Sequence, residues 1–190
     1  MIILKTDQEI AMMREANRIL AQLFEHLKPM VQPGITTAEL DAEAELFIRS
    51  RGGVPAFKGY RGFPATLCTS VNEAVVHGIP SEKRLNSGDI VSIDVGALLN
   101  GFYSDAARTF PVGNISKQTQ ALIDATRQFL EAGINQAYPG NRLSDISSAV
   151  QQVVESAGFS VVRDFVGHGI GRGLHEDPQI PNFGKKGNGV

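Results

Sequence analysis

Apolar residues recur at helical spacing in two early segments of the chain. The first begins at Thr6-Asp7-Gln8-Glu9, which has the form of a capping box, and ends before Pro29. The second begins at Thr36, has Glu39 three residues later, and ends at Gly52-Gly53. The apolar positions are Ile10, Met13, Ile19, Leu20, Leu23, Phe24 and Leu27 in the first segment, and Leu40, Ala44, Phe47 and Ile48 in the second. The spacing predicts two helices joined by a turn at Pro33-Gly34.

The same order of helix, turn and helix returns in the second half of the chain. The Pro-Gly turns at 33 and 139 are 106 residues apart, and so are the terminal glycines Gly52 and Gly158. This offset predicts one domain over 1–190 built as a repeat, with halves of about 1–112 and 113–190. Proline and glycine punctuate many helix pairs, so the two landmarks also fit a chain without a repeat. The later helices carry Leu122, Ala125, Phe129 and Ala132, and then Ile146, Ala149, Val153 and Ala157.

Between the halves, the stretch "GDIVSIDVGALLNGFYSDAARTFPVG" alternates apolar with small or polar residues on both sides of Asn100-Gly101. This dipeptide is a strong signal for a two-residue hairpin loop. With such a loop, two residues face each other across the hairpin when their residue numbers add up to 201. One face of the hairpin is then a core face, with Val91, Ile93, Val95, Ala97, Leu99, Phe102, Ala106 and Phe110. The other face carries Ser92, Asp94, Gly96, Tyr103, Asp105 and Ala107.

Two aspartates become diagonal neighbours on the second face, since Asp94 lies opposite Ala107 and Asp105 opposite Gly96. Carboxylates that point into one small space repel each other unless they share a proton or a cation, and divalent ions accept carboxylate oxygen readily. Two solvated aspartates on an exposed face are the simpler interpretation. A three-residue loop would move Asp105 to the Val/Ile face, where an unpaired charge is costly, so the apolar pattern favours the two-residue loop.

Three histidines lie near glycine and outside the predicted helices: His77, His168 and His175. A lone histidine is more often structural, and His26 on the first helix is interpreted as a surface side chain. Three histidines beside a pair of aspartates favour a metal site, because imidazole is a common ligand for transition metals.

The stretch "GHGIGRGLHEDP" at 167–178 has glycine at every second position. It has neither the third glycine of G-x-G-x-x-G nor the G-K-[ST] of a phosphate loop. We expect an extended segment with one face of bare backbone, which a neighbouring strand or ligand can approach closely. The other face would carry His168, Ile170, Arg172 and Leu174. His175 has the opposite parity, so the two histidines are expected to play different parts.

Composition narrows the class of partner. The chain has 190 residues, 42% of them hydrophobic, and a formal net charge of -2. We expect no binding to DNA or to anionic membranes, because no block of Lys and Arg creates a basic field. No run of about 18 apolar residues and no export signal occur, which predicts a soluble, unexported chain. The single cysteine, Cys68, excludes an internal disulfide framework.

Taken together, "CTSVNEAVVHGIP" at 68–80, the aspartates at 94 and 105 with ten residues between them, and "GHGIGRGLHEDP" resemble type I methionine aminopeptidase. The resemblance covers the whole chain in order. Prolidase and aminopeptidase P share the Asp, Asp, His order but are not expected to carry the run from Cys68 to Glu73, and no long insertion suggests the type II enzyme. The resemblance implies an α+β pita-bread fold with a pseudo-two-fold repeat, in which helices cover an antiparallel sheet.

The resemblance also implies roles for individual residues. Asp94 would bind one metal ion, Asp105 would bridge two, and His168 would bind the other. His77 would lie near the amino end of the substrate, and His175 would donate to the scissile carbonyl oxygen. The pocket for the methionine side chain would draw on Tyr60, Phe63, Cys68, Phe57 and Leu174, each of which also fits ordinary core packing.

The implied reaction is hydrolysis by a metal-bridging water, with the free amine of the substrate bound to metal so that only the first residue is removed. The substrates would be peptides or nascent chains with an N-terminal methionine, in the cytoplasm. Cobalt, manganese, iron and zinc all suit such ligands. The family has two metal ions per site, and we expect fewer here.

The family pattern has two further glutamate ligands after the position of Val190. The counterpart of Asp94 in the repeat would likewise fall at position 200, so we expect an incomplete second half, an exposed sheet edge and self-association. Three interpretations remain open: a shortened aminopeptidase with weak activity, a non-catalytic protein that recognises N-terminal methionine or a partner chain, and a site completed by another copy or fragment.

Overall fold

A computed structural model describes residues 1–190, which form two compact units. The N-terminal unit comprises Leu4–Ser116 together with the short segment Ile170–His175. The C-terminal unit comprises Met1–Ile3, Lys117–Gly169 and Glu176–Val190. The organisation as one domain with halves of about 1–112 and 113–190 stays a prediction.

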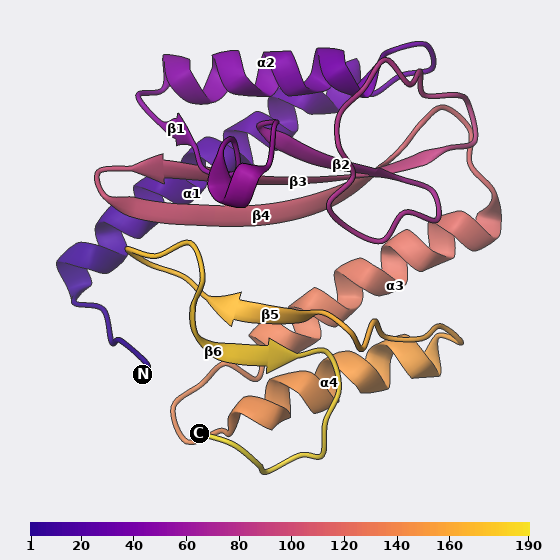
Figure 1. Ribbon diagram of the computed structural model, residues 1–190. Helices are drawn as coiled ribbons and strands as arrows, with labels where there is room; N and C mark the ends of the chain where they lie inside the picture. Colours follow the sequence, from indigo (N-terminus) through magenta and orange to yellow (C-terminus); the bar gives the residue numbers. More distant parts are fainter. The chain divides into compact units, whose positions relative to one another are not determined.

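The N-terminal unit consists of two helices and an antiparallel sheet (Figure 1). Helices α1 and α2 confirm the first two predicted helices. In each, the N-cap threonine and the glutamate three residues later form a reciprocal capping box, Thr6 with Glu9 and Thr36 with Glu39. The elements are α1 (Asp7–Leu27), η1 (Lys28–Met30), α2 (Thr37–Ser50), β1 (Val54–Pro55), η2 (Tyr60–Gly62), β2 (Leu67–Val71), β3 (Ile90–Leu99) and β4 (Phe102–Pro111).

Strand β3 is the centre of this sheet. It pairs with β4 along one edge and with β1 and β2 along the other, and all pairs are antiparallel. The β3–β4 register confirms the predicted two-residue loop, since Asp94 faces Ala107 and Gly96 faces Asp105. At the loop, Asn100 has φ 50° and Gly101 φ 79°, the pair of positive φ values that a type I′ turn requires.

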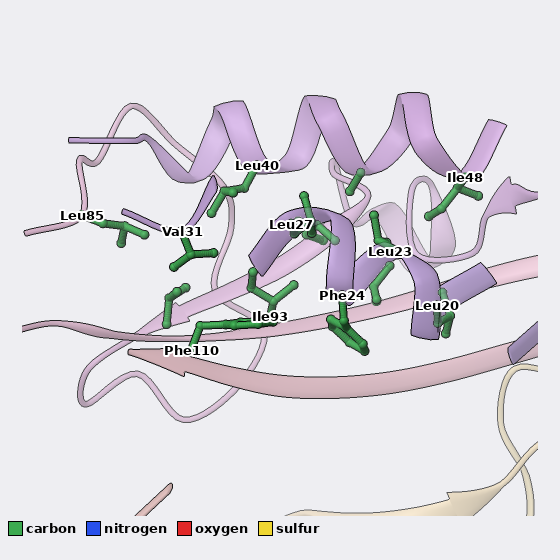
Figure 2. Close-up of a cluster of buried hydrophobic side chains, with 14 of the residues drawn as sticks. Leu20, Leu23, Phe24, Leu27, Val31, Leu40, Ile48, Leu85, Ile93 and Phe110 are labelled. Atoms are coloured by element: carbon green, nitrogen blue, oxygen red, sulfur yellow. The ribbon is translucent and has the colours of Figure 1, made fainter. Parts of the chain in front are cut away.

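The predicted core face of the hairpin packs beneath α1 and α2 (Figure 2). Ile93 and Phe110 from the sheet meet Leu20, Leu23 and Phe24 from α1 in one buried cluster. Leu99 and Ala106, also predicted for this face, are partly buried against the cluster. Because the helices occupy this side of the sheet, the aspartates lie on the opposite side.

The C-terminal unit consists of two packed helices and a β-hairpin: α3 (Lys117–Ile134), α4 (Leu143–Ser156), β5 (Val166–Gly169) and β6 (Glu176–Pro181). Helix α4 starts at 143 and ends at 156, each 106 residues after the corresponding end of α2. The caps match as well, because Asp145 accepts a hydrogen bond from the Arg142 amide at 2.8 Å, as Glu39 does from Thr36. No helix in the structure has the length and apolar character needed to cross a membrane.

The glycine-rich stretch forms a regular strand over only part of its length. The predicted extended conformation is confirmed for Val166–Gly169, where a Cβ on Gly169 would lie 2.3 Å from the Asp177 carbonyl oxygen. Glycine there lets β6 approach closely. The prediction is wrong for Ile170–His175, which has no strand conformation and belongs to the N-terminal unit. The parity argument that separated His168 from His175 therefore does not apply, because no continuous strand joins them.

Candidate functional site

The carboxyl groups of Asp94 and Asp105 converge on the face of the sheet opposite the helices. Each is partly buried and faces a residue with little or no side chain, Ala107 and Gly96. Burial, the charge of Asp105 and a hydrogen bond between the two side chains raise the pKa of Asp94 to about 7. A hydrogen bond between two carboxyl groups requires a proton between them, so the pair carries less than its full negative charge near neutral pH.

This pair fits a divalent cation. A cation would replace the shared proton and remove the repulsion between two ionised carboxylates, and carboxylate oxygen is a preferred ligand of hard and borderline ions. No group of three or more His, Cys, Asp and Glu side chains in the structure is arranged to hold a metal ion. The acid pair thus supplies part of a ligand set.

Cys68 lies directly beside the acid pair, opposite Asp94 in the β2–β3 register. Its side chain is buried, and burial together with the negative charges of Asp94, Asp105 and Asp41 raises the pKa of the thiol to about 12. The thiol therefore stays protonated and behaves as a small, polarizable apolar group.

Phe57 packs on the same face of the sheet. A Cβ built on Gly96 would lie only 2.7 Å from the Phe57 ring, so glycine at this position makes room for the ring. Because Gly96 faces Asp105, the phenyl ring adjoins the acid pair. The structure thus brings Phe57 and Cys68, two of the predicted pocket residues, next to the predicted metal ligands of this unit.

Tyr60 and His175, which are 115 positions apart, form a direct contact. The Tyr60 hydroxyl lies 3.0 Å from His175 Nδ1, and the two rings stack at a centroid distance of 5.4 Å with 27° between their planes. Phe63, at the end of the same turn as Tyr60, is partly buried, and Leu174 beside His175 is buried.

The segment that carries His175 is fixed to the hairpin by three contacts. The Tyr103 amide donates to the Gly171 carbonyl at 2.8 Å. The guanidinium of Arg172 stacks over the Phe102 ring at 4.4 Å and pairs with Glu9 at 3.3 Å. These contacts hold His175 to the unit that contains the acid pair.

His77 lies on the loop that follows β2 and is exposed, with φ 59°. A positive φ is uncommon for a residue other than glycine and is frequent at functional positions. The next residue fixes the loop, because the Gly78 carbonyl accepts from the Thr69 amide at 2.7 Å and the Gly78 amide donates to the Ser70 hydroxyl at 3.2 Å.

His168 belongs to strand β5 of the C-terminal unit and is partly buried. Its Nδ1 lies 2.8 Å from the Gly169 carbonyl oxygen. Since a carbonyl only accepts, Nδ1 carries the proton and a neutral ring has its lone pair on Nε2. This is the tautomer of a histidine that binds a metal through Nε2.

The model of metallopeptidase family M24 matches residues 11–190 of the chain. The chain belongs to this family. Among M24 relatives, the methionine aminopeptidase of Clostridium perfringens is 59% identical over 189 residues, which cover 100% of this chain and 76% of that protein. Methionine aminopeptidase 1 of Bacillus subtilis is 54% identical over 189 residues, which again cover 100% of this chain and 76% of that protein. The crystal structure of methionine aminopeptidase from Rickettsia prowazekii superposes with a TM-score of 0.98 at 40% identity, over 100% of this chain and 77% of that one.

These comparisons confirm the fold expected from the sequence. The chain has the pita-bread fold of the M24 metallopeptidases, with helices and an antiparallel sheet, and is shorter than its M24 relatives. M24 membership also supports a dependence on divalent metal ions.

Sequence patterns missed the residues that position the site. Arg172 was assigned only to one face of an extended segment, and its partners Glu9 and Phe102 lie far away in sequence. Asp41 was also missed, although its carboxylate accepts from the amides of Thr66 and Leu67 at 2.9 and 2.7 Å and so ties α2 to the start of β2. The one available signal for Asp41 was that this charged residue directly follows Leu40, close to the apolar face of the second predicted helix.

Proposed function

We propose that the chain is a metal-dependent aminopeptidase that removes the N-terminal methionine from peptides and nascent proteins. The M24 relatives named methionine aminopeptidase support this substrate. The single observation that carries the proposal is the placement of Asp94 and Asp105 as diagonal neighbours on one face of the β3–β4 hairpin, in the register that the sequence predicts.

In this proposal Asp94, Asp105 and His168 hold the metal ions. When bound, a divalent ion makes a water more acidic and polarises the carbonyl group of the substrate. The tautomer of His168 supports its role as a ligand through Nε2. Cobalt, manganese, iron or zinc would suit this mixture of carboxylate and imidazole.

The remaining residues act on the substrate. His175 donates a hydrogen bond to the oxygen of the scissile carbonyl as negative charge develops there. His77 contacts the amino end of the substrate. Phe57, Tyr60, Phe63, Cys68 and Leu174 surround the methionine side chain, and their aromatic, sulfur-bearing and aliphatic surfaces suit a thioether. The uncharged state of the Cys68 thiol supports this role, because an apolar side chain is not favoured beside a thiolate.

The 190 residues span 76% of the Clostridium relative, and the family resemblance implies two glutamate ligands beyond position 190. Asp94, Asp105 and His168 are the only metal ligands proposed here, and we propose that these three residues by themselves hold fewer than two metal ions and support only weak hydrolysis. The alternative is a protein that recognises N-terminal methionine or a partner chain without catalysis. The proposed setting is the cytoplasm, where new chains carry their initiator methionine.

Turnover of a Met-Ala-Ser peptide in the presence of manganese or cobalt tests the proposal. We expect release of free methionine that is lost in Asp105→Asn and kept in Asp124→Asn, a matched change on the exposed side of α3. Release of methionine by the Asp105 variant at the rate of the unchanged chain would contradict the proposed site. Binding of the peptide without release of methionine would favour the alternative.

Self-association through the edge of β4 is a second part of the proposal. No strand other than β3 pairs with β4, and apart from the hydrogen bond between Tyr103 and Gly171 the outer edge of β4 is a template for another strand. Light scattering at several protein concentrations measures this directly. A strict monomer that stays soluble would contradict it.

A further inference from the structure

The contact between Tyr60 and His175 joins a pocket residue to the residue proposed to donate to the substrate. The distance of 3.0 Å between the Tyr60 hydroxyl and His175 Nδ1 is that of a hydrogen bond. The two rings also stack, with their centroids 5.4 Å apart, and this is a second restraint. Rotation of the imidazole about its Cβ–Cγ bond would both separate the stacked rings and break the hydrogen bond. The imidazole is thus held at one edge and across one face.

Elementary chemistry decides the direction of this hydrogen bond. A phenol is a stronger acid than a neutral imidazole N–H, and an unprotonated imidazole nitrogen is a better acceptor than a phenol oxygen. The lower-energy arrangement therefore has the Tyr60 hydroxyl as donor and His175 Nδ1 as acceptor. In a neutral imidazole, the proton then lies on Nε2.

The turn around Tyr60 and the side chain of Arg61 hold the tyrosine ring, and with it the hydroxyl group, in place. Within the turn of η2, the Tyr60 amide donates to the Phe57 carbonyl at 2.9 Å and the Phe63 amide donates to the Tyr60 carbonyl at 3.0 Å. The Gly59 amide closes the turn on the Phe63 carbonyl at 2.7 Å. Arg61 places its guanidinium 5.4 Å from the centroid of the Tyr60 ring, a cation–π contact that also orients the ring.

We propose that Tyr60 is a positioning residue that fixes His175 in the Nε2–H tautomer, so that Nε2 is the atom that donates to the carbonyl oxygen of the substrate. The inference rests on the proposed function, because that function gives His175 a donor role. A histidine in the other tautomer would present an acceptor to the substrate oxygen and would repel it. Tyr60 thus contributes through its hydroxyl as well as through the apolar ring that lines the pocket.

The chain has four histidines, so nitrogen NMR of the ¹⁵N-histidine-labelled protein gives a tractable test. The His175 signals are identified by their loss in His175→Gln. At pH 8 we expect Nδ1 of His175 to resonate as an unprotonated nitrogen and Nε2 as a protonated one. In Tyr60→Phe we expect a mixture of both tautomers, and in the control Tyr138→Phe, the same change at an exposed tyrosine, the wild-type pattern.

The proposal is overturned if His175 carries its proton on Nδ1 in the unchanged protein, or if Tyr60→Phe leaves the tautomer unchanged. The first outcome needs no variant, so misfolding of Tyr60→Phe does not remove the test. The NMR result does not depend on turnover, so the two proposals can fail separately. If the tautomer is as proposed but no methionine is released, the proposed function fails and the tautomer assignment stands. Where turnover is measurable, Tyr60→Phe is expected to lower kcat about tenfold, the value of one hydrogen bond of about 1.4 kcal/mol, with KM nearly unchanged.

Discussion

Asp105 faces Gly96 across the β3–β4 hairpin, and the missing side chain at Gly96 is what allows Phe57 to lie beside the acid pair. One glycine therefore serves two purposes. It leaves space in which Asp105 can turn toward Asp94, and it seats an aromatic ring against the backbone of β3.

Gly96→Ala should damage the site through Phe57. The new methyl group would lie 2.7 Å from the ring, so the ring or the strand must move. Overpacking of this kind typically costs about 1–3 kcal/mol of the free energy of unfolding. Urea denaturation measures the loss. The double variant Gly96→Ala/Phe57→Ala relieves the clash, so its destabilisation should be smaller than the sum of the two single effects, and strict additivity would show that the ring does not pack on Gly96.

The metal-free protein should lose stability as the pH rises from about 4 to about 7. The pKa of Asp94 is raised to about 7 in the folded chain, against about 3.9 for an unfolded aspartate. Within this interval the folded state binds a proton that the unfolded state has released, so a higher pH favours unfolding. Urea midpoints between pH 4 and pH 8 measure the slope. Asp94→Asn should make the slope shallower, and an unchanged slope would argue against a shared proton.

Cys68 should be unreactive in the folded protein. Burial and three neighbouring carboxylates raise the pKa of its thiol to about 12, so almost no thiolate exists at pH 8. Labelling with iodoacetamide at pH 8 should proceed only when urea unfolds the chain. Since Cys68 is the single cysteine, mass spectrometry reads the modification without ambiguity. Complete labelling of the native protein would contradict the protonated, buried state.

Gly78→Ala should release the loop that carries His77. A Cβ at position 78 would lie 2.2 Å from the carbonyl oxygen of Thr69, a backbone atom of β2 that cannot move away without breaking the strand. We expect faster proteolysis of the loop after β2 and loss of methionine release, while α1 and α2 keep their helical circular dichroism. An active variant with an intact loop would show that the loop position is not required.

Much of the N-terminal unit was predictable because its signals are local. The capping boxes at Thr6 and Thr36 mark where two helices begin, and Asn100-Gly101 selects a turn that sets the whole β3–β4 register. From that register, the placement of Asp94 and Asp105 on one face follows by counting.

The remaining features depend on contacts between distant segments. Glycine alternation at 167–175 indicated an extended strand, yet only Val166–Gly169 forms one, because the residues after it are fixed to the N-terminal unit by Arg172 and Gly171. The Tyr60–His175 contact likewise joins a turn to a loop 115 positions later. No periodicity encodes such a pair, since Tyr60 begins the three-residue turn η2, which is too short for a repeating pattern, and His175 lies in a loop.

Calorimetric titration of the metal-free chain with manganese tests the central claim most directly. If Asp94 and Asp105 hold a cation in place of their shared proton, binding saturates and releases a proton, so the measured heat changes with the ionisation enthalpy of the buffer. We predict this behaviour for the unchanged chain and for Asp124→Asn, and its loss in Asp105→Asn. Absence of saturable binding, or equal binding by the Asp105 variant, would contradict the account.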